Sequence, residues 1–184
     1  GKDHWEGVDD IEDVAKCLKD FDAISTRELS GVDICKDSFK CENAKHVLDP
    51  TMLMEKEFYL EIISKYDISN ISKGGLVTYI LDSAEEKKQI IGYIQKSLTI
   101  QKTSHLKEFN SSNVIYTVPQ WLASFVYADV VGTDSFHGMG FSIIFEKNFI
   151  AIGNKDRGLD RFTSLLSLLG LEDRLVFSLK DIKN

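Results

Sequence analysis

Short apolar runs alternate along this chain with segments in which apolar residues recur every three or four positions. The runs predict strands over residues 21–25, 47–48, 76–81, 114–118, 129–133 and 149–152, of which 76–81 is the clearest. Residues 76–81 (LVTYIL) are almost continuously apolar. Such a run is typical of a parallel strand that is covered on both faces.

The periodic segments predict amphipathic helices between these strands. One helix carries Ile11, Val14, Ala15 and Leu18 behind a cap at Asp9 or Asp10, and another covers 55–65 with Phe58, Ile62 and Tyr66 on one face. A third carries Ile90, Ile91, Ile94 and Leu98 behind a capping box of Ser83 and Glu86, and further helices cover 119–128, 135–146 and 159–169. Pro119 suits the first position of its helix, and Gly170 suits the end of the last one.

Strands that alternate with helices predict βαβ units and a mainly parallel sheet with helices on both faces. The expected fold is therefore a three-layer, Rossmann-like α/β domain. The length of 184 residues suits one domain, over 1–184. Ligands of such sheets bind at the carboxyl ends of the strands, so the loops that lead into the following helices are the places to look for chemistry.

Composition and charge exclude some classes of function. The chain is 43% hydrophobic and 28% charged, with a formal net charge of −7. This charge disfavours general affinity for nucleic acid or an acidic membrane, which needs a basic face, but leaves room for a small anion pocket. No apolar run approaches the length of a membrane span, and the polar, acidic opening does not resemble a signal peptide. Because the chain starts without Met, we expect a fragment of a longer protein.

The three cysteines do not form a recognisable framework. Cys17, Cys35 and Cys41 are odd in number and irregularly spaced, and no Cys-x-x-Cys pair or histidine cluster completes a zinc site. We therefore expect reduced thiols in a cytosolic protein, and no metal.

The loop at 132–138 (GTDSFHG) lies between a predicted strand and a predicted helix. The first turn of a helix exposes N–H groups that can bind an anion. Gly138 would let a ligand approach the backbone, and His137 carries a ring suited to proton transfer near neutral pH. Alternatively, Asp134 or Ser135 only caps the helix and the histidine is packed or hydrated. Residues two apart do not face each other on a helix, so a Ser–His nucleophile pair is not expected.

Two earlier loops add charged candidates. Arg27 follows the strand predicted over 21–25, where a guanidinium can hold a carboxylate or phosphate through two parallel bonds. Asp49, at the end of the next predicted strand, can act as a base or orient a partner. The simpler alternatives are a surface pair of Arg27 with Glu28, and a cap by Asp49 in front of Pro50. The motifs alone favour these alternatives.

A fourth loop, at 153–158, follows the strand predicted over 149–152. It holds Asn154, Lys155 and Arg157, and its two cations would add positive charge beside the histidine. A solvated loop is the usual interpretation of such mixed charge. Cations, a histidine and a helix N-terminus at successive strand ends nevertheless suit a small, highly anionic ligand. No glycine-rich Walker or Rossmann phosphate loop is found in the sequence, which disfavours bound NAD and an ATPase.

In these loops the sequence resembles the polysaccharide pyruvyl transferase family. The similar segments are 24–28 (ISTRE), 46–51 (HVLDPT), 128–138 (ADVVGTDSFHG), 141–145 (FSIIF), 154–162 and 169–175 (LGLEDRL). They occur in the family's order and extend over nearly the whole chain. The Asp-Ser-Phe-His-Gly signature is the most specific of them.

This resemblance implies a fold similar to the C-terminal half of a two-domain GT-B glycosyltransferase. By this resemblance, an N-terminal domain outside this chain would hold another part of the cleft. The resemblance also implies transfer of pyruvate from phosphoenolpyruvate onto a pair of sugar hydroxyls as a ketal, without a cofactor, metal or flavin. The acceptor would be a sugar or a lipid-linked oligosaccharide in exopolysaccharide or capsule biosynthesis. The location would be cytoplasmic, at the inner face of the membrane.

The same resemblance assigns roles to individual residues. Arg27 would hold the carboxylate or phosphate of phosphoenolpyruvate, and His137 would protonate the enol carbon or bind the leaving phosphate. Asp49 would help a hydroxyl to lose its proton. Arg157, with Lys155 as a substitute, would neutralise the departing phosphate. The expected substrate-binding residues are Ser135, Gly138, Asn154, Lys155 and Arg157.

Two other functions stay open. A GT-B glycosyltransferase that uses a nucleotide sugar shares the fold, and a fold does not determine a function. It would need a base-stacking site and a ribose-binding carboxylate, for which the sequence offers no convincing pair. A non-catalytic domain could instead bind a glycan or another subunit. The presence of Arg27, Asp49 and His137 weighs against this last alternative.

Overall fold

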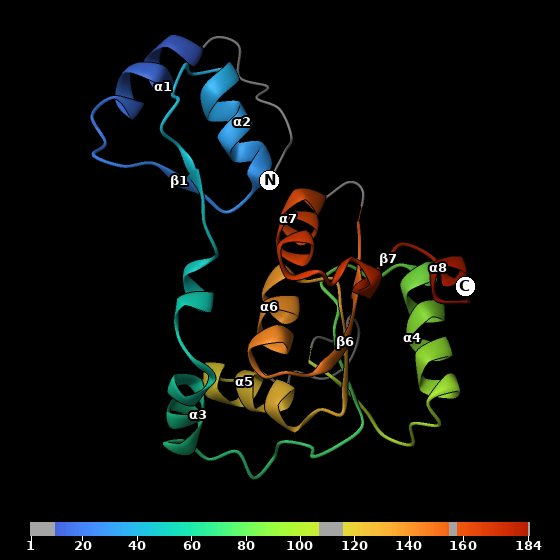
Figure 1. The fold of residues 1–184 in the computed structure, drawn as a ribbon. Helices are drawn as coiled ribbons and strands as arrows, with labels where there is room; N and C mark the ends of the chain where they lie inside the picture. Colours follow the sequence, from blue (N-terminus) through green and yellow to red (C-terminus); the bar gives the residue numbers. More distant parts are fainter. Residues whose placement is uncertain (1–9, 107–115, 155–157, 184) are drawn as a thin grey trace. The chain divides into compact units, whose positions relative to one another are not determined.

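The computed structural model describes residues 10–106, 116–154 and 158–183 of the chain, whose path is shown in Figure 1. The contacts divide the chain into two compact units. Gly1–Pro50 and Asn154–Glu172 form the first, here called the two-stranded unit. Thr51–Gly153 and Asp173–Asn184 form the second, here called the five-stranded unit. That 1–184 is one domain of a larger transferase stays a prediction.

The five-stranded unit is built on a parallel sheet with the strand order β4-β3-β5-β6-β7. Its strands are β3 (Leu76–Tyr79), β4 (Thr103–His105), β5 (Val130–Thr133), β6 (Asn148–Ile152) and β7 (Leu175–Val176). Every neighbouring pair is parallel, with Leu76 opposite Val130 and Thr133 opposite Ala151. The strands β3, β5 and β6 are predicted by the apolar runs at 76–81, 129–133 and 149–152, and all five carboxyl ends lie at one edge.

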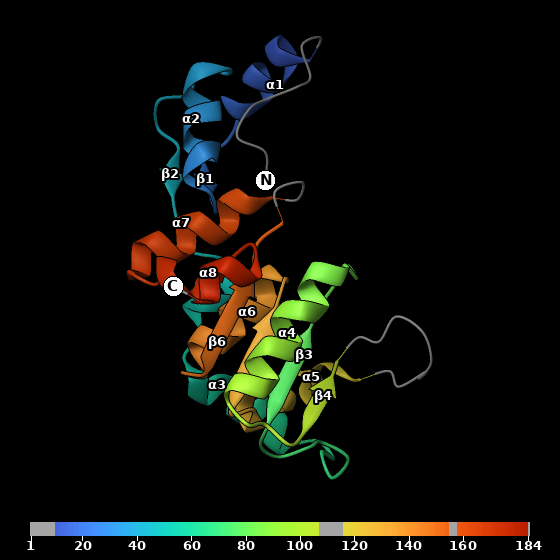
Figure 2. The same cartoon turned by 90° about the vertical axis from the view of Figure 1, so that its right-hand side faces the viewer.

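Helices cover both faces of this sheet (Figure 2). On one face α4 (Glu85–Ser97) and α8 (Leu179–Lys183) close a core of buried side chains. The members of this core are Leu76, Ile90, Ile94, Ile152 and Val176. On the other face lie α5 (Val118–Tyr127) and α6 (Phe136–Ile144), with α3 (Lys56–Ser64) packed against α5. This is the predicted three-layer, Rossmann-like α/β fold.

Successive residues of β5 face opposite layers, as the pleat of a strand requires. A Cβ on Gly132 would meet the side chain of Ile91 in α4, whereas Thr133 lies against Gly138 in α6. The layer on the α6 side is rich in aromatic rings. The ring of Trp121 lies 5.3 Å from that of Tyr79 and 5.3 Å from that of Phe141, both edge to face. Such pairs add about 0.5–1.5 kcal/mol to the burial of their area.

The two-stranded unit pairs β1 (Ser25–Thr26) in parallel with β2 (Lys45–His46), and α2 (Leu29–Asp37) contacts both strands. The unit also contains α1 (Ile11–Leu18) and α7 (Leu159–Leu169), and α7 contacts α2. The helices predicted here are confirmed, and Gly170 ends α7 in the left-handed conformation. Asp10 occupies the N-cap position of α1, but its side chain does not cap the helix. Two short 3-10 helices, η1 (Pro50–Leu53) and η2 (Glu172–Arg174), complete the described elements.

The two predicted strands of this unit are displaced. Residues 21–24 are not a strand, and the Phe21 side chain is 62% exposed. The second strand lies at Lys45–His46 instead of 47–48, and Val47 is exposed. Apolar character predicted burial at these positions, but strands of two residues contribute too little local pattern to be located.

The buried face of α3 differs from the predicted one by one residue. The sequence predicts Phe58, Ile62 and Tyr66 on the apolar face, but Phe58 and Tyr66 are exposed. Tyr59 and Ile63 are buried instead. The ring of Tyr59 packs against Phe141 of α6 and against Phe145 just after it, so tertiary contacts choose between two neighbouring apolar stripes.

Two helix starts also differ from prediction. The capping box predicted at 83–86 is wrong, because the N-cap of α4 is Ala84 and no side chain caps it. The strand predicted over 114–118 lies partly outside the described residues, and α5 begins within it. There Thr117 and Gln120 form a capping box that was not predicted from the sequence. Strands β4 and β7 and helix α2 were likewise not predicted.

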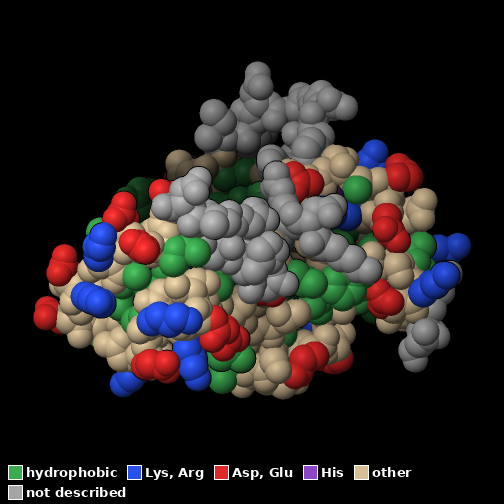
Figure 3. Space-filling model, turned by 90° about the horizontal axis from the view of Figure 1, so that it is seen from above, with side chains coloured by type: hydrophobic (Ala, Val, Ile, Leu, Met, Phe, Trp, Pro, Cys, Tyr) green, Lys and Arg blue, Asp and Glu red, His purple; other side chains and the backbone are tan. Residues whose placement is uncertain are grey.

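Charged side chains of both signs are interspersed over the part of the surface seen in Figure 3. Many form exposed pairs, such as Lys65 with Glu61 and Lys56 with Glu146. The second pair raises the pKa of Lys56 and lowers that of Glu146. Such a mixture is typical of a solvated surface. In the described part of the chain, no helix combines the length and apolar character needed to cross a membrane.

Candidate functional site

The strand connections leave β3 and β5 toward opposite sides of the sheet. From β3 the chain passes through α4 to β4 on one side, and from β5 it passes through α6 to β6 on the other. Adjacent parallel strands whose connections leave in opposite directions open a crevice at their carboxyl ends, where α/β proteins bind ligands. The loops after β3 and β5 are therefore the candidate site of the five-stranded unit.

A relay of hydroxyl groups ties the start of α6 to the end of β3. Thr133 Oγ1 donates to the carbonyl oxygen of Tyr79 at 2.7 Å and accepts from the N–H of Ser135 at 3.0 Å. Ser135 is the N-cap of α6, and its Oγ accepts from the N–H of Gly138 at 3.3 Å. A Cβ on Gly138 would collide with the side chain of Thr133. Gly138 is thus needed for the close approach of α6 to β5.

Asp134 and Lys87 form a buried ion pair across the same crevice. The Asp134 Oδ2 to Lys87 Nζ distance is 2.5 Å, and the two side chains are 2% and 10% exposed. Asp134 also accepts from the N–H groups of Leu81 at 2.6 Å and Asp82 at 3.2 Å. Lys87 donates a further bond to the carbonyl oxygen of Asp82 at 3.1 Å. Burial, and then the charge of Asp134, raise the pKa of Tyr79.

His137 lies in the first turn of α6 with an exposed side chain. Its ring contacts that of Phe136 edge to face, with centroids 5.7 Å apart. The predicted proton-transfer residue is therefore accessible to a ligand, next to a helix end that favours anions. Ser135 has the capping role that the sequence left open, whereas Asp134 does not cap the helix but joins the two loops.

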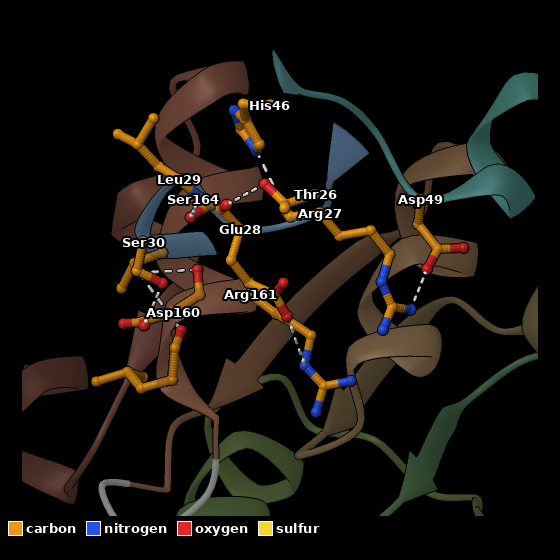
Figure 4. A network of polar contacts seen from close by, with 12 residues as sticks. Thr26, Arg27, Glu28, Leu29, Ser30, His46, Asp49, Asp160, Arg161 and Ser164 are labelled. Carbon is orange, nitrogen blue, oxygen red and sulfur yellow. Dashed lines mark hydrogen bonds and ion pairs between the residues drawn. The ribbon is translucent and has the colours of Figure 1, made fainter. Parts of the chain in front are cut away.

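In the two-stranded unit, Arg27 and Asp49 meet directly (Figure 4). Arg27 Nη1 donates to Asp49 Oδ2 at 2.6 Å, between residues 22 positions apart. The carboxylate side chain is 3% exposed and the arginine side chain 40% exposed. The sequence predicted both residues separately, and the structure brings them together. A guanidinium has five N–H donors in a rigid fork, so this pair orients Arg27 while leaving it able to bind an anion.

Other polar contacts of this unit lie to the left of the pair in Figure 4. Glu28 lies next to Arg161 of α7, with Oε1 and Nε 3.5 Å apart. Ser30 donates to Asp160 at 2.7 Å, and the N–H of Leu29 donates to Ser164 Oγ at 3.2 Å. The surface pair of Arg27 with Glu28 that the motif alone favours is therefore not what forms, because each residue has a different partner.

The loop at 153–158 supplies three further predicted residues. Asn154 follows β6 and is half-buried. Lys155 and Arg157 lie outside the described residues. Among the described residues, no group of three or more His, Cys, Asp or Glu side chains is arranged to hold a metal ion.

Lys87 and Arg161 were not predicted from the sequence as members of a polar site. One feature of the sequence could have pointed to Lys87. A lysine in the first turn of a helix opposes the helix dipole and needs another reason to be there. Arg161 left no comparable signal, because its partner Glu28 lies in a distant segment of the chain.

Each unit thus carries groups at a strand end that suit an anion: Arg27 in the two-stranded unit, and His137 with the N-terminus of α6 in the five-stranded unit. A profile of the family described as polysaccharide pyruvyl transferase matches residues 9–156. The chain therefore belongs to the polysaccharide pyruvyl transferase family, as the resemblance of its motifs predicts. No curated protein and no solved structure gives a significant match.

Proposed function

We propose that this chain transfers pyruvate from phosphoenolpyruvate to two hydroxyls of a sugar, as a ketal, in exopolysaccharide or capsule biosynthesis. A proton adds to C3 of the donor and makes C2 electrophilic. One hydroxyl adds to C2 and loses its proton, the C2–O bond to phosphate breaks with its electron pair leaving on phosphate, and the second hydroxyl adds likewise. Of the two protons released, one balances the proton gained by C3 and the other leaves with phosphate.

The observation that carries this proposal is the Arg27–Asp49 pair in a chain of this family. Phosphoenolpyruvate presents a carboxylate and a phosphate, and both match the fork of a guanidinium. Because Asp49 is buried and bound to Arg27, we assign it mainly to orienting the arginine. Its predicted role as a base toward the sugar hydroxyl stays a prediction.

We assign the proton transfer, or the binding of the leaving phosphate, to His137. Its exposed ring stands in the first turn of α6, where the helix dipole favours negative charge. The reaction as written uses only acid–base chemistry and anion stabilisation, so we propose that no cofactor takes part.

A ligand-binding assay with matched variants tests the proposal. The melting temperature is measured with phosphoenolpyruvate, a UDP-sugar or inorganic phosphate, on the unaltered chain and on Arg27→Ala, Arg27→Lys and His137→Gln. A ligand at 100 times its Kd stabilises by about 2.7 kcal/mol, which gives a clear shift. Arg174→Ala is the control, because Arg174 is 38% exposed and also pairs with a carboxylate, that of Asp173.

We expect a shift with phosphoenolpyruvate that Arg27→Ala abolishes and Arg174→Ala retains. His137→Gln should keep donor binding but lower the rate of phosphate release with a sugar acceptor by about 10²-fold or more, as loss of a general acid does. A shift with the UDP-sugar alone would replace this proposal with a nucleotide-sugar glycosyltransferase. If none of the three ligands shifts the melting temperature, this chain alone holds no donor site, and the same assay on the full-length protein separates a site completed by a further domain from a non-catalytic role.

A further inference from the structure

We infer that Lys87 and Asp134 are positioning residues for His137. Their ion pair holds the segment that leads into α6 and cancels the carboxylate charge beside the start of that helix. This inference rests on the proposed function for the identity of the anion that binds there. The geometry on which it stands is independent of that function.

The ion pair lies where a ligand of this fold is expected. It joins the loops after β3 and β5 at the point where the strand connections diverge, which is where α/β sheets bind ligands. Three bonds to Asp134 and one from Lys87 to Asp82 fasten these loops to each other. They hold the residue immediately before the N-cap of α6, and His137 follows only three positions later.

At the start of α6, one residue caps the helix and the residue before it binds the loop after β3. An aspartate at the N-cap position accepts from the first N–H groups of its helix, but Asp134 lies one residue before the N-cap of α6. Here Ser135 accepts the bond from Gly138, whereas Asp134 bonds to the loop after β3 and to Lys87. An unpaired carboxylate at this place would repel an anionic ligand. The ammonium group of Lys87 removes that repulsion.

The pair is costly if stability is its only purpose. Burying two charges requires desolvation that their attraction only partly offsets, and well-packed apolar residues often serve stability as well or better. Lys87 also sits in the first turn of α4, where a positive charge opposes the helix dipole. Stability alone therefore explains the pair poorly, whereas control of charge and position beside an anion site explains it directly.

Three variants test the inference. Lys87→Met removes the charge and the donor, Lys87→Gln removes the charge but keeps a donor, and Lys87→Arg keeps both. Lys88→Met is the charge-matched control, because Lys88 is 67% exposed and lies on the same helix. Ile94→Ala is the stability control, because Ile94 is buried in α4 on the core side of the sheet.

Two readouts are needed. The first is a set of three constants for phosphoenolpyruvate: Kd, KM and kcat. They are measured under conditions in which circular dichroism shows that each variant is folded. The second is the NMR signal and hydrogen exchange of the Gly138 amide, which bonds to the N-cap of α6 and needs no turnover. We expect Lys87→Gln and Lys87→Met to raise the Kd about tenfold, the loss typical of one charge-assisted contact, and Lys87→Arg to restore most of it. The Gly138 amide should shift and exchange faster in Lys87→Met but not in Lys88→Met.

The inference is overturned if folded Lys87→Met and Lys87→Gln keep the original Kd and an unchanged Gly138 amide. It is also overturned if Ile94→Ala, at a similar loss of stability, changes both readouts equally. If the unaltered chain binds no phosphoenolpyruvate, the proposed function fails, but the amide readout still decides whether Lys87 positions the start of α6. Should Lys87→Met not fold, Lys87→Gln and Lys87→Arg carry the same comparison.

Discussion

The two units of this chain differ in the interactions that stabilise each of them. The five-stranded unit has a continuous apolar core on the α4 side of its sheet and an aromatic layer on the other. The two-stranded unit has strands of two residues and a first helix, α1, with no buried residue. Polar contacts such as Arg27–Asp49 and Ser30–Asp160 connect its distant segments. The five-stranded unit is thus built on a continuous apolar core, whereas in the two-stranded unit polar pairs add to a smaller set of buried apolar side chains, such as Phe162 and Leu166 of α7.

The same comparison holds for the two ion pairs. In the two-stranded unit the carboxylate of Asp49 is buried and Arg27 is 40% exposed, so the cation stays accessible to a ligand. In the five-stranded unit both partners are buried, and the ammonium group of Lys87 is engaged with Asp134 and Asp82. An arginine can hold a carboxylate and still bind a second anion, whereas a buried lysine acts as a point charge for one location. The first pair suits binding and the second suits positioning.

The largest expected effect concerns the apolar core of the five-stranded unit. Leu76→Ala should lower the free energy of unfolding by about 2–5 kcal/mol, because the side chain is fully buried and its removal leaves a cavity. Phe21→Ala, in the two-stranded unit, should change it by no more than about 0.5 kcal/mol, because the ring is largely exposed. Urea unfolding followed by circular dichroism measures both. An equal loss in the two variants would contradict the difference between the units.

A second effect concerns the packing of α6 on β5. Gly138→Ala should cost about 1–3 kcal/mol, because its Cβ would collide with Thr133, whose hydroxyl already bonds to Tyr79 and Ser135. Gly140→Ala on the same helix should be neutral or stabilise by up to about 1 kcal/mol, since a Cβ added there would meet no atom within 4 Å beyond its chain neighbours and its own helix backbone. Thermal unfolding of the two variants gives the answer, and a Gly140→Ala loss as large as that of Gly138→Ala would refute it.

A smaller effect tests the polar contacts of the two-stranded unit. Ser30→Ala removes the donor to Asp160 and should cost about 1 kcal/mol, the net worth of one hydrogen bond. Ser64→Ala is the control, because its hydroxyl bonds locally to the carbonyl oxygen of Glu61 at the exposed end of α3. Hydrogen exchange of residues 29–37 should quicken in Ser30→Ala and stay unchanged in Ser64→Ala. No difference between the two would mean that this contact does not hold α2.

The smallest effect is a dependence on pH. Burial, with a smaller contribution from Cys41, raises the pKa of the Cys35 thiol from its usual value of 9.0. Above pH 9 the unfolded chain loses this proton before the folded chain does, so stability falls as the pH rises from 9 toward the folded pKa. Cys35→Ala removes this contribution. The difference in unfolding free energy between the unaltered chain and Cys35→Ala should therefore shrink between pH 8 and pH 10, and a constant difference would contradict the raised pKa.

Residue patterns were sufficient where many residues contribute to one element. The apolar runs at β3, β5 and β6 and the periodic segments at α4, α5, α6 and α7 predicted these elements and the Rossmann-like fold, because each repeats its signal over a full strand or several helical turns. The same patterns failed for β1, β2, β4 and β7, which have two or three residues each. They also predicted the wrong buried face for α3, because this helix has two neighbouring apolar faces and only tertiary packing decides which one is buried.

The amino-acid sequence by itself was enough to predict Arg27, Asp49 and His137 at strand ends, because ligands of parallel sheets bind where strands lead into helices. Only the folded chain decided which residues pair. Arg27 meets Asp49 across 22 positions, and Lys87 meets Asp134 across 47. Periodicity reports the face on which a residue lies, whereas an ion pair depends on which loops the sheet order brings side by side. That is why the amino-acid pattern yielded the layers of this protein, and why the partners of its buried carboxylates came only from tertiary structure.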